Sequence, residues 1–329
     1  MRWCGADGRF LMAKETVQHR FTYWIQGRAD DDTTPVPNMK AHFECDKTGE
    51  NLIINDVNAK GGLITRMNVR RSATNIVMNY AANGLNNRDA IAVSPDLRYV
   101  AYDSDFVQVD QDQQSAGLKL VPVGHSKSHR IGGSLRWSAD SSLLFNVTIT
   151  GDDAKHHQEA IQIIDVGNGK DMTGNLPAGS WFENGAFLPD GSELLLFLRP
   201  SQNDIKPDPG SVFACRTAPM VLCRSIISDV DEVTFSDGGK IATVKEVLKD
   251  PKRRLDGDAE ILPIAYVAEI RSMGGKLIAR QRFARKSEEL ELRLLISPAG
   301  KEVALVRHEW SQAAQHRWSG SIIDLDPGK

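Results

Sequence analysis

The chain has 329 residues, of which 41% are hydrophobic and 25% are charged, and its formal net charge is −3. This composition is typical of a soluble globular protein, and the length suits two ordinary domains or one large β or α/β-barrel unit. Forty basic residues against 43 acidic ones argue against a nucleic-acid partner. No apolar run approaches the roughly 20 residues of a membrane-spanning helix, so we predict no membrane span.

The first residues, RWCGADGRFLMA at Arg2–Ala13, do not resemble a secretory signal peptide. Asp7, Gly8 and Arg9 interrupt the only candidate apolar run, and no basic stretch precedes one. We therefore expect no signal peptide in the chain as given, and we interpret this segment as the first copy of a repeat.

Seven segments share one pattern: an apolar residue, a small or polar residue, a turn rich in Pro, Asp or Gly, and then an apolar strand. The turns are about 41 to 61 residues apart, the range expected of propeller blades. They are centred near Asp7, Thr48, Asp96, Asp140, Asp190, Gly238 and Ala299. The residue before each turn is apolar in every copy: Cys4, Cys45, Val93, Trp137, Phe187, Phe235 and Ile296.

Each repeat predicts four short antiparallel strands, because tight Asp-Gly turns favour hairpins and the second strand is nearly all apolar. We predict an all-β fold, a single β-propeller domain over residues 1–329 with seven four-stranded blades. Six blades is the alternative if the weak second copy, Phe43–Asn55, is discounted. The N-terminal strand near residues 2–4 is expected to close the ring against the C-terminal blade at residues 290–326.

Four copies, SPDLRYVAY, SADSSLLFN, LPDGSELLL and SPAGKEVAL, carry a pattern that resembles the repeat of TolB-type β-propellers. This family is related to the WD-repeat propellers, although the Trp-Asp dipeptide of WD repeats is absent here. The resemblance implies a bacterial propeller and suggests the periplasm. The residues themselves leave the compartment open.

The four cysteines do not show a metal-binding spacing. Cys4 and Cys45 occupy the apolar position of their repeats, so we expect them to be free, buried side chains that are too far apart to bridge. Cys215 and Cys223 flank an expected hairpin, and a disulfide between them is left open.

Two loops combine groups that could bind a metal ion. Asp152 and Asp153 precede His156 and His157, and the segment VDQDQQ at 109–114 holds two aspartates, but neither has the spacing of a known site. We expect no cofactor, with calcium as the alternative.

The nucleophile elbow, the phosphate-binding loop and the zinc-protease helix motif are all missing from the sequence.

The loops expected between second and third strands are long and polar, whereas the first-to-second turns are tight. Elaboration at one rim of a propeller favours a binding face there. The charges on this rim are mixed, which suits a protein or peptide better than a polyanion. The candidate binding residues are Asp110, Asp112, Asp152, Asp153, His156, His157, Lys252, Arg253, Arg254, Trp310 and His316.

The sequence therefore predicts a monomeric, non-catalytic β-propeller scaffold that binds a protein or peptide partner through its loop-rich rim. A role in envelope assembly or toxin neutralisation is a special case of this function. The alternative is a propeller lactonase or hydrolase that uses a metal or carboxylates at the axial channel.

Overall fold

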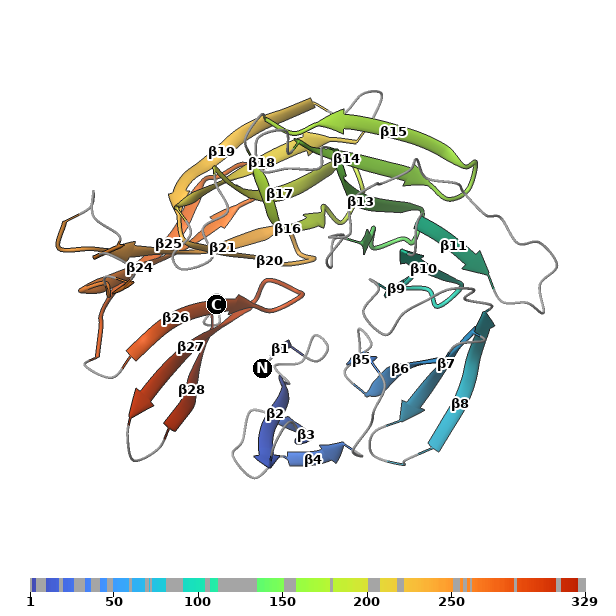
Figure 1. Cartoon of the computed structure of the whole chain (residues 1–329), viewed down its shortest axis with the longest axis horizontal. Helices are drawn as coiled ribbons and strands as arrows, with labels where there is room; N and C mark the ends of the chain where they lie inside the picture. Colours follow the sequence, from blue (N-terminus) through green and yellow to red (C-terminus); the bar gives the residue numbers. More distant parts are fainter. Residues whose placement is uncertain are drawn as a thin grey trace. The chain divides into compact units, whose positions relative to one another are not determined.

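A computed structural model of the chain shows β-strands as its regular elements throughout the part that it describes, which confirms the all-β prediction (Figure 1). In that part, no helix is long and apolar enough to cross a membrane. The described residues are 2–3, 10–17, 20–26, 33–36, 42–45, 50–58, 61–68, 71, 73–80, 91–103, 107–111, 135–150, 158–177, 180–200, 208–217, 222–250, 255–256, 259–260, 262–286, 289–311 and 315–324.

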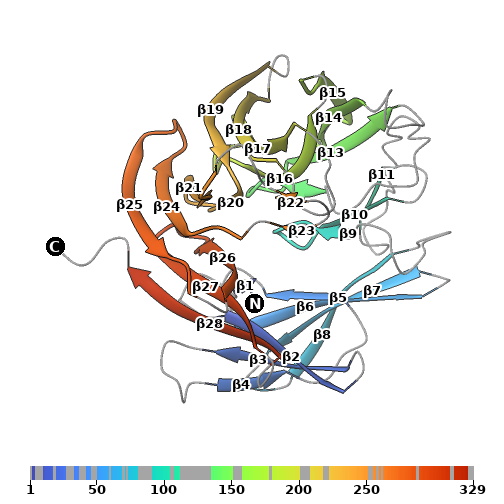
Figure 2. The ribbon, with the colours of Figure 1, turned by 60° about the vertical axis from the view of Figure 1, so that its left-hand side comes forward.

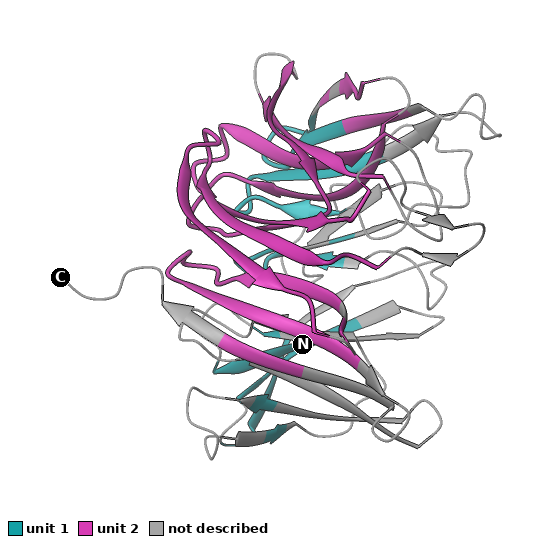
Figure 3. Ribbon diagram, turned by 90° about the vertical axis from the view of Figure 1, so that its left-hand side faces the viewer, with its two compact units in different colours: residues 1–152, 162–171 teal, residues 153–161, 172–329 magenta. Residues whose placement is uncertain are grey.

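The chain forms two compact units, residues 1–152 with 162–171 and residues 153–161 with 172–329 (Figure 3). Each sheet of unit 1 is an antiparallel meander of strands that are consecutive in sequence. The first sheet contains β1 (Arg2–Trp3), β2 (Phe10–Val17), β3 (Arg20–Gln26) and β4 (Thr33–Val36). The second contains β5 (His42–Cys45), β6 (Asn51–Asn58), β7 (Gly61–Asn68) and β8 (Ala73–Tyr80), and the third contains β9 (Ile91–Val93), β10 (Tyr99–Asp103) and β11 (Val107–Gln111).

The fourth sheet has residues in both units: β12 (Arg136–Trp137), β13 (Leu143–Thr150), β14 (Gln158–Asp165) and β15 (Lys170–Asn175). Unit 2 continues with a sheet of β16 (Trp181–Phe187), β17 (Glu193–Arg199), β18 (Gly210–Arg216) and β19 (Leu222–Val230). The next sheet contains β20 (Glu232–Phe235), β21 (Lys240–Val247), β24 (Ala265–Ser272) and β25 (Leu277–Ala284), with the hairpin β22 (Leu255–Asp256) and β23 (Ala259–Glu260) inserted after β21. The last contains β26 (Glu289–Ile296), β27 (Glu302–Ser311) and β28 (Gln315–Asp324).

The predicted number of blades requires a correction. Within the described residues five sheets have the four antiparallel strands of a propeller blade, so neither seven nor six such blades are present. In the part of the chain that the structure describes, the third sheet (β9–β11) and the last sheet (β26–β28) have three strands each. The sequence repeat marks the turn between the first and second strands, and it does not reveal whether a fourth strand forms.

The N-terminal strand belongs to the first sheet, and its closure of a ring against the C-terminal blade stays a prediction. Arg2 pairs with Leu11 and Trp3 pairs with Phe10, so β1 is the first strand of the first sheet, and the C-terminal sheet consists of β26, β27 and β28. A local hairpin closes a much shorter loop than pairing with the C-terminal residues would, which lowers its entropic cost.

A serine organises the turn between the first and second strands in four of the copies. Its backbone N–H donates to the carbonyl of the first residue of the second strand, and its hydroxyl accepts the backbone N–H of that same residue. The donor–acceptor distances to the hydroxyl are 2.9 Å for Tyr99 to Ser94, 2.9 Å for Leu143 to Ser138, 2.8 Å for Lys240 to Ser236 and 3.1 Å for Glu302 to Ser297. All four serines are buried, so these bonds satisfy polar groups that have no access to water.

The last or next-to-last residue of each turn adopts a left-handed backbone. This conformation favours glycine, and three of the five copies have glycine there. The φ angles are 62° at Leu97, 65° at Ser141, 69° at Gly191, 74° at Gly239 and 69° at Gly300. The expected tight turns are therefore confirmed, and the copy at 236–239 is one residue shorter than the others, as its sequence predicts.

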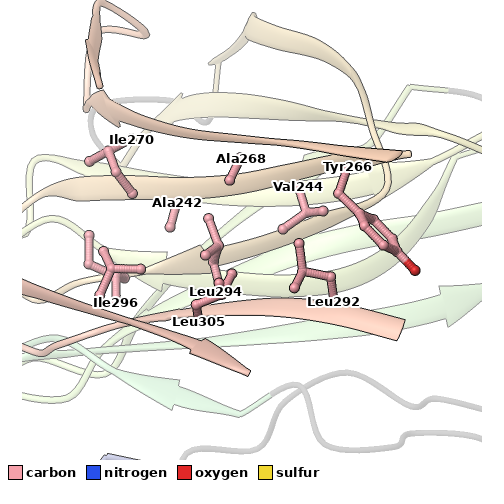
Figure 4. Close-up of a cluster of buried hydrophobic side chains, with 10 residues drawn as sticks. Ala242, Val244, Tyr266, Ala268, Ile270, Leu292, Leu294, Ile296 and Leu305 are labelled. Atoms are coloured by element: carbon pink, nitrogen blue, oxygen red, sulfur yellow. The ribbon is translucent and has the colours of Figure 1, made fainter. Parts of the chain in front are cut away.

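In unit 2, the later strands of one sheet pack against the first and second strands of the next sheet through apolar residues. All but the first residue of β17 are buried, which agrees with its sequence, ELLLFLR. In unit 2, β21, β24, β26 and β27 share one hydrophobic cluster that includes Val244, Tyr266, Leu292 and Leu305 (Figure 4). In unit 1, the Trp137 indole packs on Tyr99 and donates a hydrogen bond to the carbonyl of Ala92 at 3.0 Å.

The cysteines differ in part from the expectation. Cys215 on β18 and Cys223 on β19 are register partners and form a disulfide, which settles the alternative that the sequence left open. Cys45 is also disulfide-bonded, with its partner outside the described residues, so the expectation of a free thiol there is wrong. Its repeat position indicates burial, but repeat position alone does not fix how far apart two side chains lie in space.

Two glycines with positive φ test the packing of unit 2 separately from backbone strain. A Cβ at Gly275 would lie 2.8 Å from the carbonyl oxygen of Ile226 on β19, whereas a Cβ at Gly169 would meet nothing within 4 Å. We expect Gly169→Ala to lower the free energy of unfolding by about 1–2 kcal/mol from backbone strain. Gly275→Ala should cost roughly a further 1–3 kcal/mol, because the backbone of β19 must move. Urea unfolding of both variants measures the difference, and equal losses would show that β19 does not pack closely on this turn.

Candidate functional site

The two ends of the unit 2 sheets differ in their connections. At one end, the first strands are joined to the second strands by turns 188–192, 236–239 and 297–301. At the other end, the second strands lead into connections 200–209, 248–264 and 312–314. The expected elaboration of one end is thus present after β17 and β21. We call this the loop-rich end of unit 2.

Two of the predicted long loops contain strand residues. The segment HEWSQAAQHR belongs mostly to β27 and β28, where Trp310 and His316 are register partners, and residues 312–314 alone separate the strands. The segment that contains Asp110 is the third strand β11, in which Asp110 pairs with Val100. The alternation of Val107 and Val109 with polar residues is a strand pattern that the prediction overlooked.

The other predicted binding residues lie outside the described residues: Asp112, Asp152, Asp153, His156, His157, Lys252, Arg253 and Arg254. Their role as a binding face stays a prediction. Lys252, Arg253 and Arg254 belong in sequence to the connection 248–264, which follows β21 at the loop-rich end.

A group of charged residues that the sequence did not single out lies where the first strands of unit 2 begin. We call it the charge cluster, and it consists of Glu183 on β16, Arg199 on β17, Glu232 on β20, and Glu291 and Arg293 on β26. The antiparallel register places it at the loop-rich end, because Trp181 at the start of β16 pairs with Arg199 at the end of β17.

Arg199 connects the cluster to the connection that follows β17. Its guanidinium is 5% exposed, and it donates hydrogen bonds to the carbonyls of Asp208 at 2.8 Å and Asp231 at 2.5 Å. Its Nε lies 3.4 Å from a carboxylate oxygen of Glu183, which sits at a β-bulge and is 43% exposed. A buried cation held by two carbonyls and an acid is rigid, so it fixes the backbone directly before Glu232.

Glu232 is the residue in the cluster whose protonation is most perturbed. Burial raises the pKa of its carboxyl group to about 7. Arg293 and Arg199 lower this pKa, while Glu291 and Glu183 raise it, so the four charges partly cancel. Glu232 therefore changes charge near neutral pH, which is frequent at binding and catalytic sites but also occurs in structural networks.

Arg293 and Glu291 form an ion pair on the face of β26 beside Glu232. The Arg293 Nε donates to a Glu291 carboxylate oxygen at 2.5 Å, and the Arg293 side chain is 49% exposed. Burial alone would lower the pKa of Arg293, but the Glu291 hydrogen bond and the charges of Glu291 and Glu232 raise it. This cation stays charged while half of it remains open to a ligand.

Hydrogen bonds between neighbouring sheets hold these strands together. The Asn184 side chain on β16 donates to the carbonyl of Val233 on β20 at 3.4 Å. The Thr234 hydroxyl on β20 donates to the carbonyl of Leu294 on β26 at 2.8 Å. Each of these residues lies within two positions of a cluster member in sequence, so the bonds between the three first strands bring their charged residues together.

The repeat alignment carried a weak signal for this site. Glu232 and Arg293 lie four residues before the turn serines Ser236 and Ser297, in strands that are otherwise largely apolar. A charged residue in a half-buried strand is unusual. The sequence could not show that these residues gather, since they come from different repeats. The described residues contain no group of three or more His, Cys, Asp or Glu side chains that could hold a metal ion.

Known proteins give structural matches and no sequence matches. No protein-family model matches the chain, and no curated protein matches it in sequence. A structure of prolyl endopeptidases aligns with 98% of this chain and 49% of that chain (TM-score 0.58, 11% identity). The tricorn protease aligns with 99% of this chain and 35% of that chain (TM-score 0.57, 12% identity). TolB from Acinetobacter baumannii aligns with 86% of this chain and 65% of that chain (TM-score 0.47, 16% identity).

These similarities show the fold and go no further. Together with the four-stranded sheets, the two peptidase matches identify a β-propeller fold. Solved structures that resemble the chain thus include both TolB and peptidase propellers. The chain spans less than two thirds of the length of each of these three chains.

Glu232 makes the stability of the fold depend on pH. The folded chain keeps the proton up to about pH 7, whereas a glutamate normally releases it near 4.5. The unfolded state therefore loses its proton first, and the free energy of unfolding falls as the pH rises from about 4.5 to about 7. We expect Glu232→Gln to remove this fall and to be more stable than the parent at pH 8, on the order of 2 kcal/mol.

Urea unfolding between pH 4 and pH 8 measures this effect, with Glu50→Gln, an exposed residue outside the charge cluster, as the control. If the free energy of unfolding of Glu232→Gln still falls with pH as steeply as that of the parent chain, Glu232 is not the group that titrates.

Proposed function

We propose that the chain is a non-catalytic β-propeller scaffold that binds a protein or peptide partner at the loop-rich end of unit 2. The observation that carries this proposal is the charge cluster. Three acids and two arginines, from the first strands β16, β20 and β26 and from the end of the second strand β17, gather at the end of the sheets where connections 200–209 and 248–264 emerge.

The chemistry of the cluster favours a polypeptide ligand. Glu183 is 43% exposed and Arg293 is 49% exposed, so charges of both signs are open to a partner. A polyanion would require a mainly basic surface, whereas a peptide carries backbone dipoles and side chains of both signs. The basic residues Lys252, Arg253 and Arg254 in the adjoining connection would add contacts at its border.

The cysteines support an oxidising compartment. Cys215 and Cys223 are paired, and Cys45 is disulfide-bonded as well. Disulfides persist mainly outside the cytoplasm, so we include the cell envelope in the proposal. An envelope-assembly or toxin-neutralising role is one form that this function could take.

A hydrolase is the second candidate, and the pKa of Glu232 favours it. A carboxyl group that titrates at about 7 beside two arginines can act as a general base at neutral pH, and the arginines could stabilise an anionic intermediate.

If the chain is a hydrolase of this kind, the rate of lactone or ester hydrolysis should rise with pH, with an apparent pKa near 7. It should fall by about 10²- to 10⁴-fold in Glu232→Gln. Release of acid from a panel of such substrates, followed by pH titration, measures this, and activity that survives the substitution excludes Glu232 as the base.

Partner capture with charge reversal tests the binding proposal. Replacing both Glu183 and Glu291 with lysine changes the loop-rich end by four charge units while leaving the buried Arg199 in place. We expect a partner captured by the tagged parent chain from its native source, and identified by mass spectrometry, to be reduced at least tenfold.

The control has the same charge change at the opposite end of the unit 2 sheets, with Asp190→Lys and Asp237→Lys in the exposed first-to-second turns. The control should retain the partner. Equal retention by both double variants would contradict the proposed site.

A further inference from the structure

The strand β25, Leu277–Ala284, is the last strand of its sheet and is open along most of its length (Figure 2). The six residues 277–282 are all exposed, including Leu277 at 43% and Ile278 at 50%. Consecutive residues of a strand point to opposite faces, so both faces of the sheet are uncovered here. Phe283 alone packs partly against the hydrophobic cluster.

The corresponding strand of the preceding sheet is covered in part. In β19, the last strand of the β16–β19 sheet, Ile227 is 7% exposed and Val230 is 4% exposed, and both pack in a hydrophobic cluster with residues of β20 and β21. On β25, Ala279 and Gln281 are exposed although their register partners Ile270 and Ala268 on β24 are buried. The buried face of this sheet therefore ends at β24, one strand before the sheet itself ends.

The open strand is basic. Residues 271–286, RSMGGKLIARQRFARK, contain six basic residues and no acidic one. Arg271 and Arg280 both approach Glu269, and Lys286 pairs with Glu309, so these cations are partly neutralised. Arg282 and Lys276 are exposed on the same strand and turn, and no ion pair links either of them to another described residue.

This charge decides which kind of strand can pair with the open edge. A second copy of β25 would place Arg280 and Arg282 opposite like charges, which is unfavourable directly across a strand pair. An acidic strand would bring carboxylates to the same positions, while its apolar residues extend the face formed by Ile270 and Ala268. An acidic, extended segment of a partner protein is therefore the occupant that the surface favours.

We propose that β25 is a second binding edge, on which an acidic extended segment of a partner adds a fifth strand to the β20–β25 sheet. The backbone of Leu277–Arg282 supplies the hydrogen bonds, and Arg280, Arg282 and Lys276 supply the charge selectivity. This edge is the fourth strand of its sheet and shares no residue with the charge cluster, so it stands or fails independently of the function proposed above.

A synthetic peptide tests the edge directly. The probe is a labelled ten-residue peptide of alternating valine and glutamate with blocked ends, and its counterpart has lysine in place of glutamate. By fluorescence anisotropy, we expect the glutamate peptide to bind at least tenfold more tightly than the lysine peptide. The double variant Arg280→Glu and Arg282→Glu should bind it at least tenfold more weakly. Arg224→Glu on β19 should change binding less than twofold, and Glu232→Gln should not affect it.

Two further measurements separate strand addition from simple charge attraction. Amide hydrogen exchange in residues 277–284 should slow when the peptide binds, while residues 222–230 stay unchanged. Methylating the backbone nitrogens of one alternate set of residues in the peptide should abolish binding, and methylating the other set should not. Equal binding of the two charge forms, equal effects of both methylations, or protection elsewhere than β25 would each overturn the proposal.

Discussion

The hydrogen-bonded turn between the first and second strands is the constraint on which the rest of the molecule depends. A buried serine hydroxyl receives the N–H of the first residue of the second strand, and a left-handed residue completes the turn within four or five residues. This tight turn fixes the register of the two strands and directs the buried second strand into the core of its sheet. The charged residues at the start of each first strand are then held at the opposite end, beside the long connections.

The charge cluster follows from this geometry and from the contacts between first strands. Asn184 and Thr234 donate to backbone carbonyls of other strands, and the buried Arg199 donates to the carbonyls of Asp208 and Asp231, so the side chains next to them have little freedom. Burial of Glu232 among two acids and two arginines costs folding free energy above neutral pH, because its charged form is poorly solvated. A residue that destabilises the fold in this way is most readily retained where it has a function. For this reason we propose that the charge cluster forms part of the binding site.

The sequence predicts the local features of this fold well. The turns, their serines and the apolar second strands are determined by neighbouring residues, and the structure has them at the expected positions, for example in SADSSLLFN at Ser138–Asn146. The number of four-stranded blades and the bonded state of Cys45 were predicted wrongly, because they depend on residues that meet only in the folded chain. The candidate site shares this difficulty. Glu183, Glu232 and Arg293 come from three repeats, and a pattern within one repeat cannot show that they gather. Trp310 and His316 were assigned to a loop because their segment is polar, yet they pair across the β27–β28 hairpin.

Site-specific photo-crosslinking at the two ends of one hairpin tests the central claim most directly. Benzoylphenylalanine replaces Glu183 at the loop-rich end of β16 in one variant and the exposed Ser192 in the opposite turn before β17 in the other. If the loop-rich end binds the partner, irradiation in the native source will link a partner to position 183 and not to position 192. Equal crosslinking at both positions, or crosslinking at 192 alone, would contradict the account.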